Sequence, residues 1–349
     1  MIIRIGSPII GIIDFKDAKS GQKKCNKGKV CGRTCIAKSR VCRIELKGTN
    51  KTASKWLVSQ DALTADGSPT MDGRIERGIE LYREELKAIE SAYARLQGER
   101  DRGSAEWDAA YDAIDAFESS NPGQVVPPEL YANLARAQRY QESIEADSEE
   151  VVTRAFSALR HKMLSGGDES MAIDIISRVV INADQLIDTG SIRDDLVSLS
   201  RISGNRVQRL KKVWQDPQHE RAYVEDEKGI INVGKGDPKP EARVLWHEFG
   251  HLVEVENPSI KAAANDFIQQ RRDGSPPKKL NQIDPDAGYE DDEKAYTGNF
   301  YHPYLGKFYK DGGTEVISMG LEGFRSPRAM RQLYQEDPLF FVFMLGVLS

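Results

Sequence analysis

The chain lacks the patterns that would place it in a membrane or on a general export route. No segment approaches the ~20 consecutive apolar residues that a membrane-spanning helix needs. The apolar N-terminus is interrupted by Arg4, Pro8 and Asp14 and has no basic leader, so it is not typical of a signal peptide. We expect synthesis in the cytoplasm, and residence there unless a dedicated device packages or exports the protein, as for a component of a virion or an injection device.

A strongly basic composition and the common nucleotide-binding motifs are also missing. The 349 residues carry a formal net charge of −5, with 39% hydrophobic and 30% charged residues. Such a composition is typical of a soluble chain with two or three domains, and it argues against a general nucleic-acid binder. We find no Gly-rich phosphate loop, no serine or cysteine nucleophile motif and no internal repeat.

Cysteines are few, and all of them lie in one short basic segment. Cys25, Cys31, Cys35 and Cys42 are accompanied by nine Lys or Arg residues and one acid between positions 23 and 47. Four thiolates could close a structural zinc site, although the spacing differs from the usual paired short loops. The alternative is two disulfides, with three connectivities. Both interpretations stay open, and the spacing favours disulfides slightly.

Helical periodicity dominates the middle of the chain. Apolar residues recur every three or four positions from 74 to 97, which predicts an amphipathic helix of more than six turns. Further helices are predicted over 104–118, from Pro128 onwards and within 149–200. We expect a helical bundle with solvated outer faces. The lone residues His161 and His219 are expected to be structural.

Two of the five histidines lie in the motif His247-Glu248-Phe249-Gly250-His251. On a helix, positions four apart share one face, so both imidazoles can bind one zinc ion. Glu248 then lies beside the bound water, whose pKa zinc lowers to about 7, and can take its proton during attack on a carbonyl. Chance produces such a motif in roughly one chain in a hundred. The apolar residues at helical spacing around it argue against chance.

Prolines frame a helix around this motif. Pro238 and Pro240 precede it and Pro258 follows it, which predicts a helix of about sixteen residues with the motif in its middle. Gly250 costs such a helix about 1 kcal/mol relative to alanine. A glycine kept at that cost indicates close backbone packing beneath the histidines.

A catalytic zinc usually has three protein ligands, so a third ligand should lie elsewhere in the chain. The candidates are Glu315, which opens a predicted helix with Glu322 two turns further on, and His302. The metzincin pattern would require a histidine at position 257, which is Asn257. We favour Glu315, because its helix can present it to the motif, whereas Pro303 makes His302 part of a loop.

Residues 221 to 233 predict two strands around a charged turn at 226–229. A strand beside the cleft could bind an extended peptide by adding it to the sheet. An ordinary hairpin without a role in substrate binding is equally compatible with the pattern.

With these residues, the C-terminal part of the chain resembles the gluzincin zinc metallopeptidases, specifically the lethal-factor-like domains of bacterial toxins and phage-encoded proteins. The resemblance rests on the motif at 247–251, on the Glu-Val-Ile-Ser-Met-Gly segment that begins at Glu315, and on a tyrosine shortly before it. It implies that Glu315 is the third zinc ligand and that Tyr309 stabilises the oxyanion. Tyr301 and Tyr304 lie near enough to take the part of Tyr309.

We therefore predict an α+β protein with three parts. A basic Cys-rich N-terminal unit is expected over 1–48, a mainly helical region over 49–200 with a linker at 48–72, and a zincin-like metallopeptidase domain over 201–349. The basic Cys-rich segment is similar to small modules of phage and phage-derived proteins.

The predicted activity is zinc-dependent hydrolysis of peptide bonds in a peptide or protein substrate, by a toxin, an effector or a phage-associated protease. His247, His251 and Glu315 would bind one catalytic zinc ion, Glu248 would act as general base, and Tyr309 would stabilise the oxyanion. A second, structural zinc ion at the four cysteines is the alternative to disulfides. The rival hypothesis is a structural component of a phage particle or contractile injection device, with other components of the particle as its partners.

Overall fold

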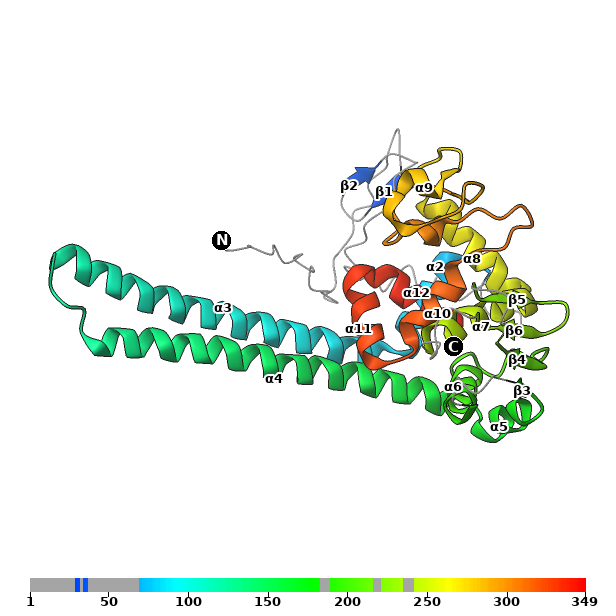
Figure 1. Cartoon of the computed structure of the whole chain (residues 1–349), viewed down its shortest axis with the longest axis horizontal. Coiled ribbons are helices and arrows are strands. Elements are labelled where there is room, and N and C mark those ends of the chain that lie inside the picture. Colours follow the sequence, from blue (N-terminus) through cyan, green and yellow to red (C-terminus); the bar gives the residue numbers. More distant parts are fainter. Residues whose placement is uncertain (1–28, 32–33, 37–68, 183–188, 216–220, 235–241) are drawn as a thin grey trace. The chain divides into compact units, whose positions relative to one another are not determined.

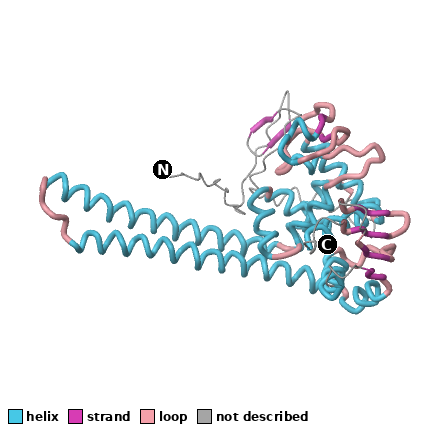
Figure 2. The backbone as a smooth tube through the Cα atoms, in the orientation of Figure 1, coloured by secondary structure: helices cyan, strands magenta, loops and turns pink. Residues whose placement is uncertain are grey.

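A computed structural model describes residues 29–31, 34–36, 69–182, 189–215, 221–234 and 242–349. These residues form a mostly helical α+β structure with a small mixed sheet (Figures 1 and 2), as the sequence predicts at this coarse level. None of the helices within these ranges has both the length and the apolar character that crossing a membrane requires. The described part of the Cys-rich segment is the hairpin of β1 (Lys29–Cys31) and β2 (Thr34–Ile36). The predicted zinc or disulfide pairing also involves Cys25 and Cys42, which lie outside the described residues.

Two long helices form one compact unit, residues 84–159. Helix α3 (Arg83–Ser120) and helix α4 (Pro128–Gly166) lie side by side (Figure 1), and α4 begins at the predicted proline. The predicted break between 97 and 104 is wrong, because α3 is continuous there. The reason is Gly103, where a Cβ atom would lie 3.0 Å from the Cδ1 of Ile144. This glycine allows the two helices to approach each other and does not end α3.

The other unit contains the described residues up to Arg83 and from Arg160 onwards. Its remaining helices are α2 (Met71–Leu81), α5 (Glu169–Ser177), α6 (Thr189–Ile202), α7 (Ala242–Glu256), α8 (Pro258–Arg271), α9 (Leu280–Ile283), α10 (Val316–Phe324), α11 (Pro327–Glu336) and α12 (Pro338–Leu348), with 3-10 turns η2 (Pro285–Ala287) and η3 (Pro303–Gly306). Helix α12 is apolar and buried from Phe340 onwards. It packs against α2, where a Cβ atom on Gly346 would lie 1.7 Å from the carbonyl oxygen of Arg74.

A four-stranded sheet has the order β3 (Val180–Asn182), β4 (Lys212–Trp214), β6 (Ile230–Asn232) and β5 (Tyr223–Glu225). The first three strands are parallel, and β5 is antiparallel to β6 at the edge. The predicted hairpin around 226–229 is thereby confirmed. A second, two-stranded sheet pairs β7 (Lys278–Lys279) with β8 (Lys294–Ala295). Helix α7 packs against β5 and β6, so the sheet supports the helix that carries the histidine motif.

Helix α7 has fifteen residues and lies between Pro240 and Pro258, as the sequence predicts. Its apolar face buries Leu245, Trp246, Phe249, Leu252 and Val253, which fixes its rotation about its own axis. Gly250 confirms the expected close packing. A Cβ atom at this position would lie 2.5 Å from the Cα of Ser318 on α10. Since real Cβ atoms do not approach so closely, α7 and α10 cross in backbone contact only because residue 250 is glycine.

This crossing predicts the effect of Gly250→Ala. The added methyl group must push α7 and α10 apart, and overpacking of this kind destabilises a protein by about 1–3 kcal/mol. Gly166→Ala is the matched control, because a Cβ atom at Gly166 meets nothing within 4 Å. That substitution should be neutral or slightly stabilising. Urea unfolding of the metal-free proteins measures both effects, and an unchanged midpoint for Gly250→Ala would contradict the importance of the crossing.

Candidate metal centre

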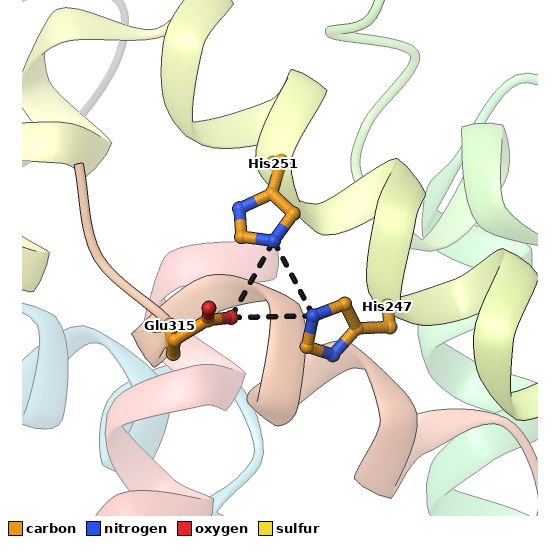
Figure 3. Close-up of side chains that lie close together, drawn as sticks. All are labelled: His247, His251 and Glu315. Carbon is orange, nitrogen blue, oxygen red and sulfur yellow. Dashed lines mark hydrogen bonds and ion pairs between the residues drawn. The ribbon is translucent and has the colours of Figure 1, made fainter. Parts of the chain in front are cut away.

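Three side chains from two helices converge on one point (Figure 3). His247 and His251 come from successive turns of α7, and Glu315 precedes the first residue of α10. The His247 Nε2 and His251 Nε2 atoms lie 3.2 Å and 3.4 Å from Glu315 Oε2, and 3.3 Å from each other. Zinc bonds of about 2.0–2.1 Å at tetrahedral angles place neighbouring ligand atoms roughly 3.3 Å apart. The three residues therefore form a set that could hold a metal ion, and its donor atoms and spacing suit zinc.

The carboxylate of Glu315 is buried and held at both oxygens. The residue has 0% of its surface exposed. Oε1 accepts a hydrogen bond from Tyr309 Oη at 2.5 Å, and Oε2 accepts one from Ser318 Oγ at 2.8 Å. Burial alone would raise the pKa of Glu315. The hydrogen bond from His247, the charges of both histidines and the hydrogen bond from Tyr309 outweigh burial and hold this pKa well below its usual range.

The second ring nitrogen of His247 contacts Glu322, a residue for which the sequence predicts no role. His247 Nδ1 lies 2.5 Å from Glu322 Oε1, and Arg243 Nη1 lies 3.6 Å from Glu322 Oε2. Burial opposes a charge on His247, but the hydrogen bonds and charges of Glu315 and Glu322 raise its pKa to about 10. A carboxylate on Nδ1 fixes the ring so that Nε2 faces the set, as is usual for metal-binding histidines.

Burial shifts the pKa values of His251 and Glu248 in opposite directions. Burial lowers the pKa of His251 to about 4, despite the attraction of Glu315. It raises the pKa of Glu248 to about 7, with the charges of Glu315 and Glu322 adding to the effect. His251 is thus neutral at pH 7, as a metal ligand must be. A group with a pKa near the working pH is suited to act as a general base.

A cleft of about 690 Å³ opens beside this set. His247 and Glu248 line it from α7, residues of α10 and α11 form another wall, and Arg221 lines it just before β5. Tyr304 also lines the cleft, with its ring 6.4 Å from the ring of His247. His247 and the neighbouring Glu248 are therefore accessible to a molecule bound in the cleft.

The rival ligand His302 also lines the cleft but has a different role. Its Nδ1 atom accepts a hydrogen bond from the backbone N–H of Tyr304 and caps η3. The cluster found among the described residues consists of His247, His251 and Glu315. Pro303 follows His302 at the start of η3, in agreement with the loop that the sequence predicts.

Two further contacts around Glu315 could not be found from the sequence. Lys307 Nζ lies 3.7 Å from Glu315 Oε1 and 2.9 Å from Glu293 Oε1. Glu254 on α7 accepts hydrogen bonds from the N–H and the hydroxyl of Thr314, at 2.9 Å and 2.6 Å. Glu254 therefore ties α7 to the residue directly before Glu315. No sequence motif marks either contact, because each joins segments that are distant along the chain.

Comparisons with protein-family models, with curated proteins and with solved structures found no match to this chain.

The buried carboxyl group of Glu254 predicts a pH dependence of stability. Burial raises its pKa to about 7, although both hydrogen bonds from Thr314 lower it. Because the folded state binds this proton more tightly than the unfolded state, the group stabilises the fold below pH 4.5. That stability is lost as pH rises from 4.5 through about 7, and the loss is on the order of 3 kcal/mol.

Glu254→Gln keeps the shape of the side chain and removes the titration. The free energy of unfolding should be measured from pH 4 to pH 8 in the presence of a chelator. We expect the wild type to lose stability relative to the variant across this range. Parallel curves for the two proteins would contradict the account.

Proposed function

We propose that this chain is a zinc-dependent metallopeptidase, with its active site in a gluzincin-type, lethal-factor-like domain over 201–349. The observation that carries the proposal is the placement of Glu248. This carboxyl group lines the cleft next to His247, one residue from a His-His-Glu set whose ligand atoms lie 3.2–3.4 Å apart. A metal set with an adjacent base on a cleft suits the metal-assisted hydrolysis of a peptide bond.

Each residue of the site has a separate role in the proposed hydrolysis. His247, His251 and Glu315 would hold zinc, which when bound supplies a Lewis acid and lowers the pKa of water. Glu248 takes a proton from the attacking water and returns it to the leaving amine nitrogen. Glu322 keeps the ring of His247 in place through Nδ1. By its position before Glu315, Tyr309 is the tyrosine that the resemblance assigns to the oxyanion.

The edge of the sheet offers a place for an extended peptide. Strand β5 lies at the edge of the four-stranded sheet, and Arg221 and Ala222 directly before it line the cleft. An extended substrate could pair with β5 through main-chain hydrogen bonds. A protein or peptide substrate bound in this way would be extended.

The biological setting of the proposal comes from the resemblance. A toxin, an effector or a phage-associated protease fits it, with components of a virion or injection device as partners. The division into parts at 48 and 200 stays a prediction. So does the choice between a structural zinc ion and disulfides at the four cysteines.

Glu248→Gln tests the proposal directly. The amide cannot take a proton but keeps the shape of the side chain, so the zinc content should stay unchanged while peptide hydrolysis falls by about 10²–10⁴-fold. Glu336→Gln is the matched control, because Glu336 also lines the cleft but is not adjacent to the His-His-Glu set in sequence. We expect it to keep activity on a library of quenched fluorescent peptides. Full activity of Glu248→Gln, or a zinc-loaded wild type that cuts no peptide, would contradict the proposal.

A further inference from the structure

Lys307 lies beside Glu315 and is held there by polar contacts. Only 13% of its side chain is exposed. Its Nζ atom lies 2.9 Å from Glu293 Oε1 and donates a hydrogen bond to the hydroxyl of Tyr304, also at 2.9 Å. Glu293 is itself held by Arg221 at 3.3 Å. A buried ammonium group is costly unless it is paired, so these contacts define one position for the charge of Lys307.

The same ammonium group lies against two tyrosine rings. Its distances from the ring centres are 4.6 Å for Tyr304 and 4.9 Å for Tyr309. A cation is attracted to the face of an aromatic ring, most strongly where water is excluded. Lys307 therefore fixes both rings on the side of the site that Glu315 Oε1 faces.

The two tyrosines differ in what their hydroxyl groups can do. Tyr309 uses its single O–H in a hydrogen bond to Glu315 Oε1 at 2.5 Å, and the other oxygen of Glu315 faces the histidines. A metal ion on that other oxygen leaves the hydrogen bond from Tyr309 in place. The described residues that line the cleft include Tyr289, Tyr301 and Tyr304 but not Tyr309. Of the two alternatives to Tyr309, Tyr301 stacks on Phe340, whereas the ring of Tyr304 lies 6.4 Å from that of His247.

Tyr304 is oriented toward the cleft by its neighbours. Its ring stacks on Tyr289 at 5.6 Å with an interplanar angle of 8°, and it lies near the ring of His247. Its oxygen accepts a hydrogen bond from Lys307, which polarises the O–H bond of Tyr304 and makes it a stronger donor.

We propose that Tyr304 is the catalytic phenol that donates a hydrogen bond to the substrate's carbonyl oxygen, with Lys307 as its positioning residue. Tyr309 is then a positioning residue for Glu315. The proposal rests on the proposed peptidase function. It departs from the resemblance, which assigns the oxyanion to Tyr309.

The test compares Tyr304→Phe, Tyr309→Phe and Lys307→Met in the full chain. Two quantities are measured: the affinity for zinc by competition with a chelator, and kcat and KM for a peptide that the wild type cuts. Tyr304→Phe should lower kcat by about 10²–10³-fold, as for loss of an oxyanion donor, with zinc affinity and KM nearly unchanged. Tyr309→Phe should weaken zinc binding by about 10–100-fold and leave most of the kcat of the zinc-loaded protein.

The Lys307→Met variant shows whether the lysine acts through Tyr304. It should lower kcat. The double variant Lys307→Met/Tyr304→Phe should lose little more than Tyr304→Phe alone, because both substitutions act on the same donor, the Tyr304 hydroxyl. Tyr296→Phe is the control, since Tyr296 packs edge-on against Phe308 and is not among the described residues that line the cleft. It should change neither quantity. A loss of kcat in zinc-loaded Tyr309→Phe, with Tyr304→Phe fully active, would overturn the proposal.

A wild type that binds zinc but cuts no peptide would refute the peptidase function and still allow a test of Tyr304. In that case, the zinc-loaded proteins are titrated with an N-phosphorylated dipeptide, whose tetrahedral anion presents oxygens to the same donors. Binding at least about tenfold weaker in Tyr304→Phe than in the wild type, equivalent to ~1.4 kcal/mol, supports the proposal. Equal affinity of the two proteins overturns it.

Discussion

The site depends on the backbone contact between α7 and α10. Gly250 lies between the two histidines, and the Cα of Ser318 occupies the space where any larger residue would place its Cβ atom. This contact brings the start of α10 to the face of α7 that carries the imidazoles. Ser318 then binds Glu315 through its hydroxyl, and Glu254 binds Thr314. One close helix crossing thus sets the positions of all three candidate ligands.

Charge is the second constraint on this arrangement. Glu248, Glu315 and Glu322 surround His247, and burial makes the negative charges of Glu248 and Glu315 costly. Without a metal ion, a proton on His247 offsets part of this charge, which is why the pKa of His247 is raised to about 10. A divalent cation would offset more of the charge and would displace that proton. Lys307 beside Glu315 and Arg243 beside Glu322 contribute fixed positive charge.

The sequence predicts those parts of the site that follow from local spacing. The helix over 242–256 follows from its flanking prolines and apolar periodicity, and the close packing at Gly250 follows from the cost of a glycine in that helix. The choice of Glu315 over His302 used helix and loop propensities, and the structure brings Glu315 to the histidines. Each of these inferences needed only residues that are close together in the chain or that share one helix.

Contacts between distant segments were beyond such reasoning. Glu254 and Thr314 are sixty positions apart, and Lys307 meets Glu293 across the turn that joins β8 to η3. Sequence spacing also could not show that Tyr289, Tyr301 and Tyr304 line the cleft and Tyr309 does not, since the answer depends on tertiary packing. The continuous helix α3 was missed for a similar reason, because the packing of Gly103 on Ile144 is a tertiary contact.

The central claim is that His247, His251 and Glu315 form a zinc site. Elemental analysis of the purified wild type, a His247→Ala/His251→Ala variant and a variant with all four cysteines changed to Ser tests it most directly. The account predicts one zinc ion per chain that is lost with the histidines and kept without the cysteines. Equal zinc in the wild type and the histidine variant, after reconstitution of both, would contradict it.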